Sequence, residues 1–409
     1  MRKLLKKIRA QIKKTFRDFV KYVRYKIVVP IVYKHYCHLP KNDKLVVFAD
    51  LRPRDTHENF VDLMKLCEEN GYEPVAINGK GYGPGVSKKK ARREQIKFQN
   101  KFLKLYAQCR ALFLVEYFPL ADAVKPRKGT EVIQLWHGCG AMKTMGYAGT
   151  GKGWGASAKD KKRYPMHQHY SLVSISSENL AWCYEQAFQI EPGIVKGLGM
   201  PRTDIYFDKE YIANARANLL KHFPEIGDRK VILFAPTFRG KSIKKSFYNV
   251  DIDFQKYREM LGDKYAFVTK FHPLMAKGGL SSSTKVKYYD FVYDATHVLT
   301  PEEALCAADI LIGDYSSIGF EYLLLERPIL AYIPDLDQYI SDRGLFYPYE
   351  KTMPGPYAFD PDELLEQLMT VDEWFDIEKT RRYREKFMSG CDGHATERIF
   401  HYVFDKDNK

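Results

Sequence analysis

Apolar residues follow two different periods along the chain. Near the start they recur every three or four positions, at Leu5, Ile8, Ile12, Phe16, Phe19, Val23 and Ile27. That is the period of one face of a helix, so the segment is predicted to form an amphipathic helix. After Pro40, short and nearly continuous apolar runs alternate with longer mixed segments. This second pattern is typical of buried parallel strands separated by helices.

The apolar runs of the body form two series. Those in the first half lie at 45–50, 74–78, 111–117, 131–137 and 172–176. Those in the second half lie at 231–237, 265–272, 309–314 and 328–333. Helices are expected between them, for example at 59–70 and 302–308, and loops at 79–93 and 148–164.

Two such series predict an α/β protein with two doubly wound, Rossmann-like domains. The expected boundaries assign 1–40 to the N-terminal helix, 41–205 to the first domain and 206–409 to the second. Ligands bind such sheets beyond the carboxyl ends of the strands. We therefore look for chemistry in the polar residues that follow each apolar run.

The positive charge of the protein is concentrated in the predicted N-terminal helix. The whole chain has a formal net charge of +14, and residues 1–26 contain eleven Lys and Arg against a single acid, Asp18. A cationic helix with an apolar stripe lies in the plane of an anionic membrane. We therefore predict contact with the membrane surface through residues 1–36. A helix docked on the body and a nucleic-acid-binding arm are the alternatives, but an arm that binds nucleic acid needs no apolar stripe.

Several classes of protein are disfavoured by what the sequence lacks. The seven cysteines are scattered without a CxxC pair, which suits a reducing cytosol. No signal peptide and no uncharged stretch of roughly 18 residues is present. GxxxxGK[ST], HExxH and GxSxG are absent as well. Asp335-Leu336-Asp337 matches a DxD motif only in its letters, so we expect chemistry without a metal or cofactor.

The first polar cluster after a predicted strand runs from Trp136 to Lys143. A histidine at a strand tip, followed by small residues, can act as general base for a hydroxyl nucleophile, and His137 is the candidate. A hydrogen-bonded structural histidine is the alternative. The expected substrate contacts in this cluster are Trp136, Gly138, Cys139, Gly140 and Lys143.

The second half of the chain supplies two further clusters. Lys270, Phe271 and His272 follow a predicted strand, and both the lysine and the histidine could meet phosphate oxygens or the charge on a leaving group. Ser316 and Ser317 begin a predicted helix, where hydroxyls and unpaired backbone N–H groups bind anions. A solvated lysine and an ordinary helix cap are the alternatives.

Three more polar groups complete the predicted site. Glu321 lies in the first turns of that same helix and could accept hydrogen bonds from ribose hydroxyls, or it could simply favour the helix dipole. Arg202 and Arg239 could each clamp a phosphate bidentately, with Pro236 and Thr237 beside Arg239. A surface arginine in a turn is the alternative for either one. The joint placement of all clusters after strands in both halves favours a single site.

Between Leu45 and Pro356 the sequence resembles the CDP-glycerol glycerophosphotransferases of teichoic acid synthesis. The resemblance is carried by several long motifs in the same order: WHGCGAMK at 136–143, MPRTD at 200–204, APTFR at 235–239, KFHP at 270–273, DYSSIGFEY at 314–322, RPILAY at 327–332, RGLFY at 343–347 and MPGP at 353–356. The form of the first motif looks more like members that add a priming unit than like polymerases. Glu321 stands where an Asp is common.

The resemblance implies a GT-B-like fold whose two domains face a cleft, with the acceptor on the first domain and the cytidine diphosphate donor mainly on the second. It also implies attachment to the cytoplasmic face of the membrane. The expected reaction transfers glycerol phosphate from CDP-glycerol to a lipid-linked acceptor and releases CMP, with His137 as base and His272 stabilising the pyrophosphate. The alternatives are a CDP-ribitol donor, a GT-B nucleotide-sugar glycosyltransferase, and a membrane-bound scaffold without activity. Nucleic acid is not expected as a partner.

Overall fold

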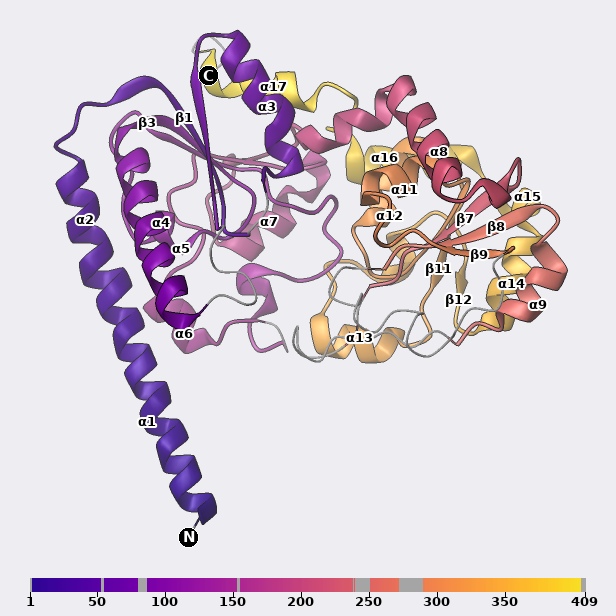
Figure 1. Ribbon diagram of the computed structural model, residues 1–409, viewed down its shortest axis with the longest axis horizontal. Helices are drawn as coiled ribbons and strands as arrows, with labels where there is room; N and C mark the ends of the chain where they lie inside the picture. The colour runs from indigo at the N-terminus through magenta and orange to yellow at the C-terminus, as the bar shows by residue number, and fades with distance from the viewer. Residues whose placement is uncertain are drawn as a thin grey trace.

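Two parallel six-stranded sheets, one in each half of the chain, form the body of the protein (Figure 1). The computed structural model describes residues 2–52, 55–79, 87–152, 155–237, 239, 251–271 and 290–405. The first sheet has the order β2-β1-β3-β4-β5-β6 and the second β12-β11-β10-β7-β8-β9. Every pairing between neighbouring strands is parallel. The predicted α/β class with two parallel-sheet domains is confirmed.

The strands of the first sheet are β1 (Asn42–Asp50), β2 (Glu73–Asn78), β3 (Cys109–Leu114), β4 (Glu131–Gln134), β5 (Leu172–Ser174) and β6 (Val195–Lys196). Those of the second are β7 (Lys230–Phe234), β8 (Tyr265–Thr269), β9 (Val292–Asp294), β10 (Ile310–Gly313), β11 (Ile329–Tyr332) and β12 (Tyr357–Ala358). Alternate residues of a strand pack into different cores: Val47 and Ala49 of β1 face one cluster, Val46 and Phe48 another. Burial on both faces explains why the sequence shows apolar runs rather than strict alternation.

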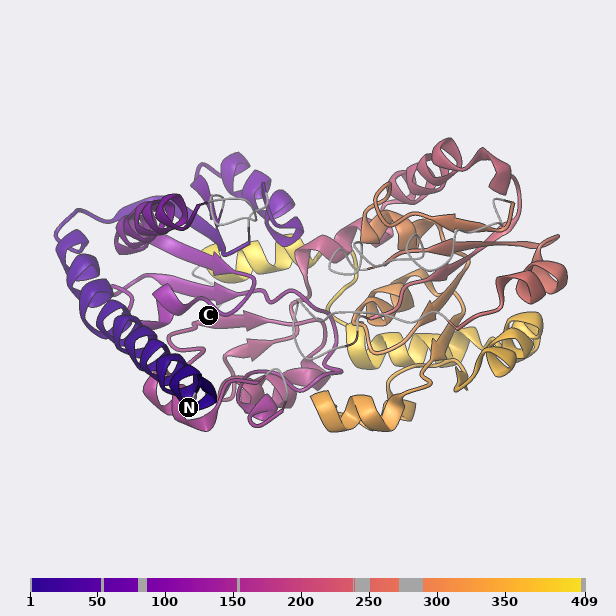
Figure 2. The same cartoon turned by 60° about the horizontal axis from the view of Figure 1, so that its bottom comes forward.

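Helices cover both faces of each sheet (Figure 2). Those around the first sheet are α2 (Val29–Tyr36), α3 (Glu58–Glu69), α4 (Lys88–Gln108), α5 (Pro119–Asp122), α6 (Ala158–Arg163) and α7 (Ala181–Phe188). Those around the second are α8 (Lys209–His222), α9 (Phe254–Leu261), α11 (Pro301–Ala307), α12 (Ile318–Tyr322), α13 (Leu336–Arg343), α14 (Pro361–Met369), α15 (Val371–Trp374) and α16 (Ile377–Met388). The predicted helices at 59–70 and 302–308 correspond to α3 and α11.

Two predicted loops are partly helical. α4 begins at Lys88, inside the segment 79–93, because the Ser87 hydroxyl caps it by accepting from the Lys90 amide at 3.3 Å. α6 lies inside 148–164 and begins after Ser157, whose hydroxyl accepts from the Asp160 amide. Because both segments are rich in lysine and glycine, the sequence did not reveal Ser87 and Ser157 as helix caps. The strands β6, β9 and β12 were missed because each has only two or three residues.

The last helix, α17 (Ala395–Phe404), lies on the first domain and not on the second, where the range 206–409 placed it. Its side chains Ile399, Phe400, Val403 and Phe404 share a core with β1 and β3. Figure 2 shows this helix, in yellow, beside the first sheet. The apolar face of α17 therefore covers the first sheet, although the helix follows the second domain in the sequence.

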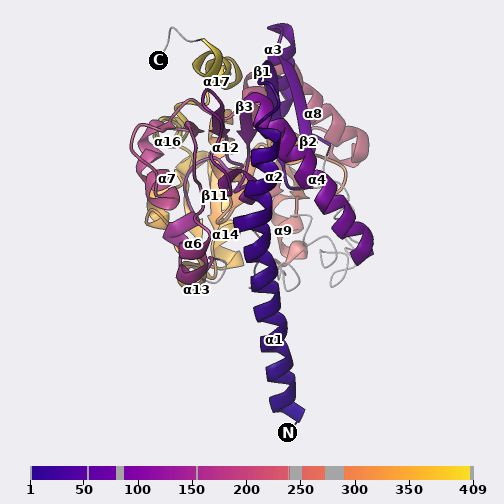
Figure 3. The same cartoon turned by 90° about the vertical axis from the view of Figure 1, so that its left-hand side faces the viewer.

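The N-terminal segment is one long helical rod that extends beyond the body (Figure 3). It comprises α1 (Arg2–Val23), a π-helical turn at Arg24–Val28 and α2. The end of the rod is anchored, since Val29 is buried and the ring of Tyr33 lies 5.4 Å from that of Tyr106. In contrast to this anchored end, the apolar side chains Ile8, Ile12, Phe16 and Phe19 of α1 are exposed. Within the described residues, no helix has the length and apolarity needed to cross a membrane.

Candidate functional site

A cavity of about 380 Å³ lies between the two domains, at the carboxyl ends of the strands. Most of its wall is the loop from Trp136 to Gly146, which leaves β4 of the first sheet. The second domain contributes Tyr315, Ser317 and Arg343. The cavity thus brings together the first predicted cluster and the serine pair of the third.

His137 is held by its own hydrogen bond at the end of the first sheet. Its Nδ1 atom lies 3.1 Å from the carbonyl oxygen of Val115, the residue that follows β3. A carbonyl only accepts hydrogen bonds, so Nδ1 carries the proton and Nε2 is the basic atom. This is the tautomer required of a general base that presents Nε2 to a substrate.

The backbone turns sharply just before this histidine. Trp136 has φ +57°, a left-handed conformation that non-glycine residues adopt rarely and that clusters at functional sites. Asn59 holds the turn in place: its Nδ2 donates to the Trp136 carbonyl and its Oδ1 accepts from the Arg202 amide, each at 3.1 Å. Asn59 is fully buried in the first turn of α3. Sequence reasoning missed it, because no local pattern links a helical asparagine to a loop 77 residues away.

The glycines of the loop let the two domains approach each other. A Cβ atom on Gly138 would lie 3.4 Å from the Ser317 hydroxyl oxygen, and one on Gly140 would lie 2.3 Å from the Phe320 ring. Gly140 also has φ +64°. Only glycine fits at position 140 without displacing α12, so this loop is shaped by its contact with the second domain.

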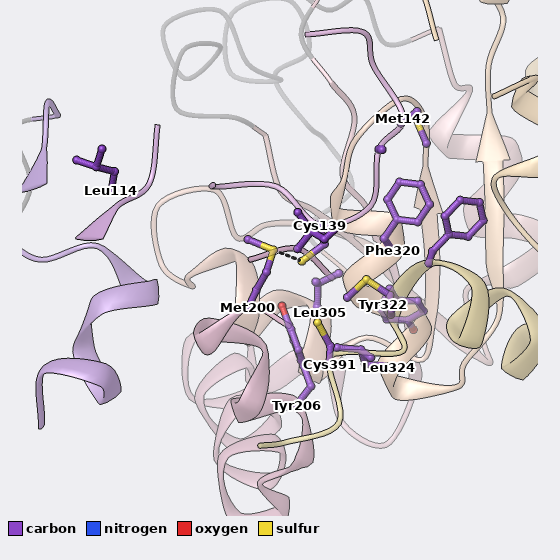
Figure 4. Close-up of a cluster of buried hydrophobic side chains, with 14 of the residues drawn as sticks. Leu114, Cys139, Met142, Met200, Tyr206, Leu305, Phe320, Tyr322, Leu324 and Cys391 are labelled. Atoms are coloured by element: carbon purple, nitrogen blue, oxygen red, sulfur yellow. Dashed lines mark hydrogen bonds between the residues drawn. The ribbon is translucent and has the colours of Figure 1, made fainter. Parts of the chain in front are cut away.

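The thiol of Cys139 packs in the hydrophobic core. Its Sγ atom lies 3.2 Å from Sδ of Met200 in a buried cluster that also contains Cys391, as Figure 4 shows. Burial raises the pKa of the Cys139 thiol well above its usual value. A protonated buried thiol is a poor nucleophile, so Cys139 is not a candidate nucleophile in the cavity that it lines.

Lys143 lies in the same loop, at the interface with the second domain. Its backbone forms an antiparallel bridge with Leu345, and the neighbouring Thr144 amide donates to the Gly344 carbonyl at 3.1 Å. Burial lowers the pKa of the Lys143 ammonium to about 8, although Asp314 opposes this shift. The loop is therefore joined to the second domain by main-chain hydrogen bonds, and these hold Lys143 next to Arg343.

Arg202 and Glu321 bind each other instead of lining the cavity. The guanidinium of Arg202 forms an ion pair with Glu321, whose second oxygen accepts from the Tyr206 hydroxyl at 3.0 Å. Glu321 is buried and the Arg202 side chain is 13% exposed, and burial raises the pKa of Glu321 while Arg202 lowers it. The pair connects the segment after β6 with α12. Its predicted contacts with phosphate and ribose stay predictions.

Arg239 is likewise held by carboxylates of its own domain. It donates to Asp314 at 2.9 Å and to Asp335 at 2.6 Å, and its guanidinium lies 4.9 Å from the centre of the Tyr315 ring. The amide and hydroxyl of Thr237, which follows Pro236, donate to Asp314 as well. This network fixes Tyr315, which lines the cavity.

The remaining predicted residues lie near the second sheet. The Lys270 ammonium donates to the carbonyls of Thr296, at 2.8 Å, and Leu299, and Phe271 is buried. His272 lies outside the described residues. Ser316 accepts from the Ile318 amide at 3.3 Å. Ser317 is the residue before α12, and its side chain makes no capping bond among the described residues, so the alternative of an ordinary cap does not hold for it.

Several residues of the cavity wall were not predicted as site residues, Arg343 and Tyr184 among them. Arg343 ends α13, and burial lowers the pKa of its guanidinium. Tyr184 of α7 donates its hydroxyl to the Gly140 carbonyl at 2.9 Å. The RGLFY motif was a usable signal for Arg343, whereas nothing local marks Tyr184. Among the described residues no group of three or more His, Cys, Asp or Glu is placed to hold a metal ion.

Comparison with known proteins places these features in a family. The family model described as CDP-glycerol:poly(glycerophosphate) glycerophosphotransferase matches residues 31–405. A teichoic acid ribitol-phosphate primase of Bacillus spizizenii is 30% identical over 89% of this chain and 92% of its own length. A teichoic acid poly(ribitol-phosphate) polymerase of the same species is 35% identical over 72% of this chain, which spans only 46% of that longer protein.

The fold has a solved counterpart. The structure of the wall teichoic acid polymerase TagF superposes with a TM-score of 0.72 at 21% identity, covering 98% of each chain. At that identity the likeness concerns the fold. The match of the family model to nearly the whole chain confirms the resemblance seen in the motifs, and the protein belongs to the CDP-glycerol:poly(glycerophosphate) glycerophosphotransferase family.

Proposed function

We propose that this protein transfers a polyol phosphate from a cytidine diphosphate donor to a lipid-linked acceptor and releases CMP. One observation carries the proposal: a single cavity between the domains is lined by His137, Lys143 and Ser317, together with Arg343. A base, two cations and a hydroxyl are what phosphoryl transfer to an alcohol requires.

In the proposed reaction an acceptor hydroxyl gives its proton to Nε2 of His137 while its oxygen attacks the phosphorus that carries the polyol. The bond from that phosphorus to the bridging oxygen breaks, and the electron pair leaves with CMP. Lys143 and Arg343 are placed to neutralise charge on the pyrophosphate oxygens. Arg202 and Glu321 would then act by holding the two domains together, and Arg239 by fixing Tyr315 in the cavity wall.

Glycerol phosphate is the proposed unit because it is named by the family to which the chain belongs. Ribitol phosphate is the second candidate. It is favoured by the ribitol-phosphate primase whose length the chain matches almost completely. We further infer a GT-B arrangement, in which closure of the domains excludes water from the cavity.

The N-terminal rod supports a proposal for where the reaction takes place. Ile8, Ile12, Phe16 and Phe19 are 46%, 62%, 66% and 60% exposed along a helix rich in Lys and Arg. Exposed apolar side chains on a cationic helix favour insertion into the interface of an anionic membrane. We place the protein at the cytoplasmic face of the cell membrane, attached through this rod.

The test is to incubate the purified full chain with a short lipid-linked acceptor and, in separate reactions, CDP-glycerol, CDP-ribitol and a UDP-sugar. CMP release with one CDP-polyol, and a product heavier by one or more polyol phosphate units, is the expected result. Transfer from the UDP-sugar alone would establish a glycosyltransferase instead. Absence of product with every donor would favour a scaffold.

A further inference from the structure

A second cavity, of about 90 Å³, lies where the N-terminal rod meets the first domain. Its lining is basic and aromatic: Lys21, Tyr25, Lys26, Tyr117, Pro119, Asp122, Ala123, Tyr164 and Pro165. Pockets for drug-sized ligands enclose about 300–1,000 Å³. This cavity therefore suits a single chemical group better than a nucleotide.

The side chains of the cavity offer positive charge and hydroxyl groups. The Lys21 ammonium lies 4.2 Å from the centre of the Tyr164 ring, and the Arg163 guanidinium lies 4.8 Å from that of Tyr22, the residue after Lys21 in α1. The Tyr164 hydroxyl oxygen is buried and has no hydrogen-bond partner among the described residues. A buried polar atom without a partner indicates a missing ligand atom or water.

Acidic groups are present, but the carboxylate in the cavity wall is already engaged. The two oxygens of Asp122 accept from the amides of His167, at 2.8 Å, and Gln168, at 2.9 Å. Burial also raises the pKa of this carboxyl to about 7, so its negative charge is weakened near neutral pH. Asp18 and Asp160 lie near Tyr164 on the exposed surface, where water screens them.

The cavity lies close to the site between the domains. The turn Gly146–Gly149 contributes Gly146 and Gly149 to the wall of the larger cavity. Tyr147 of the same turn projects elsewhere, accepting from the Met166 amide at 3.0 Å and lying near Tyr117 of the smaller cavity. One turn of the chain therefore connects the two cavities.

The apolar stripe of α1 lies on the other side of the rod. At 100° per residue, Lys21 is roughly opposite Phe16 and Phe19. If those rings enter a membrane, the cavity lies on the opposite side of the helix, one helix diameter of roughly 10 Å from the apolar face. That distance corresponds to the level of the lipid headgroups.

From this arrangement we infer that the smaller cavity binds the phosphate group of the lipid-linked acceptor, with Lys21 and Lys26 as its cations and the Tyr164 hydroxyl as a donor. The lipid tail would follow the stripe of α1 into the membrane, and the acceptor headgroup would pass the turn Gly146–Gly149 towards His137. This inference rests on the proposed function, because it assigns one part of the acceptor to a place in the fold.

The test compares two double variants that remove the same charge from the same rod. Lys21→Ala with Lys26→Ala changes the cavity, whereas Lys13→Ala with Lys14→Ala changes exposed positions outside it. Calorimetry with the full chain measures the binding of a water-soluble, short-chain prenyl diphosphate. We expect the cavity variant to weaken this binding at least tenfold, and the control pair to leave it within twofold of the unchanged protein.

A kinetic measurement locates the effect on the acceptor. With a short-chain prenyl-diphosphate acceptor the cavity variant should raise KM at least tenfold, while KM for the donor and kcat stay within twofold. With a matched alkyl glycoside that lacks the diphosphate, neither pair should change KM. Binding to vesicles of phosphatidylglycerol and phosphatidylcholine should weaken equally in both pairs, since both lose two charges near the surface.

Three results would overturn the inference: equal loss of prenyl diphosphate binding in both pairs, equal changes in KM for both acceptors, or displacement of the prenyl diphosphate by soluble short-chain phosphatidylglycerol. The last result would assign the cavity to bulk phospholipid. Failure of the proposed function is a separate outcome. In that case the unchanged protein releases no CMP with any acceptor, and the calorimetric comparison still decides whether the cavity binds a lipid phosphate.

Discussion

The buried ion pair between Arg202 and Glu321 allows a quantitative test of how the two domains are held together. Replacing Arg202 by Met keeps most of the side-chain volume and removes the charge. Glu321 is then left buried, with only the Tyr206 hydroxyl and the Cys139 thiol, both neutral, beside it. An uncompensated charge of this kind destabilises a folded protein by about 3–5 kcal/mol. We therefore expect Arg202→Met to lower the free energy of unfolding by that amount.

Adding Glu321→Gln to the same chain should restore part of the loss. Glutamine is neutral and can still accept the Tyr206 hydroxyl, so the double variant should be more stable than Arg202→Met alone by at least about 1 kcal/mol. The exposed pair Arg258–Asp290, whose side chains are 47% and 59% exposed, is the matched control. Arg258→Met should cost no more than about 1 kcal/mol.

Urea unfolding followed by circular dichroism measures all four proteins. Two results would refute the reasoning: a loss in Arg202→Met no larger than in Arg258→Met, or a double variant less stable than the single one. A third outcome would assign Arg202 a different role. If Arg202→Met keeps its stability but loses affinity for the donor, the guanidinium acts on substrate, as the sequence first indicated.

Three further predictions concern the loop that lines the cavity. His137→Gln should lower kcat by two or more orders of magnitude while calorimetric affinity for the CDP-polyol stays within about threefold, because a base is lost and the donor contacts are not; near-normal turnover would exclude His137 as base. Gly140→Ala should abolish transfer and lower the midpoint of thermal unfolding, since the added Cβ would meet Phe320 at 2.3 Å in a left-handed conformation, whereas Gly151→Ala, at an open left-handed position, controls for the conformational strain alone. Lys143 has a pKa near 8 and is a cation only below that value, so kcat/KM should fall as pH rises through about 8, and a pH profile unchanged in Lys143→Met would contradict its role.

The sequence was informative wherever function follows a local pattern. Apolar runs marked most of the strands, and the polar residues after them included His137, Lys143 and Ser317, which the structure brings to one cavity. Strand-end placement is a property of the fold class, and the fold class follows from the runs.

The contacts that orient those residues could not be predicted in the same way. The hydrogen bond from His137 to the Val115 carbonyl joins the segments that follow two neighbouring strands, and the bond from Asn59 to Trp136 crosses from a helix to a loop. Arg202 and Glu321 looked like separate ligand contacts, because their pairing spans 119 positions. Periodicity and motif spacing carry no information about such distant partners.

The position of α17 has a consequence for biosynthesis. Phe48 and Phe113 are among the first aromatic residues of the body to leave the ribosome, yet Phe400 and Phe404, which pack in their cluster, emerge almost 290 residues later than Phe113. A domain that waits for a distant helix exposes apolar surface throughout translation. This part of the first core therefore stays incomplete until residue 404 has been translated.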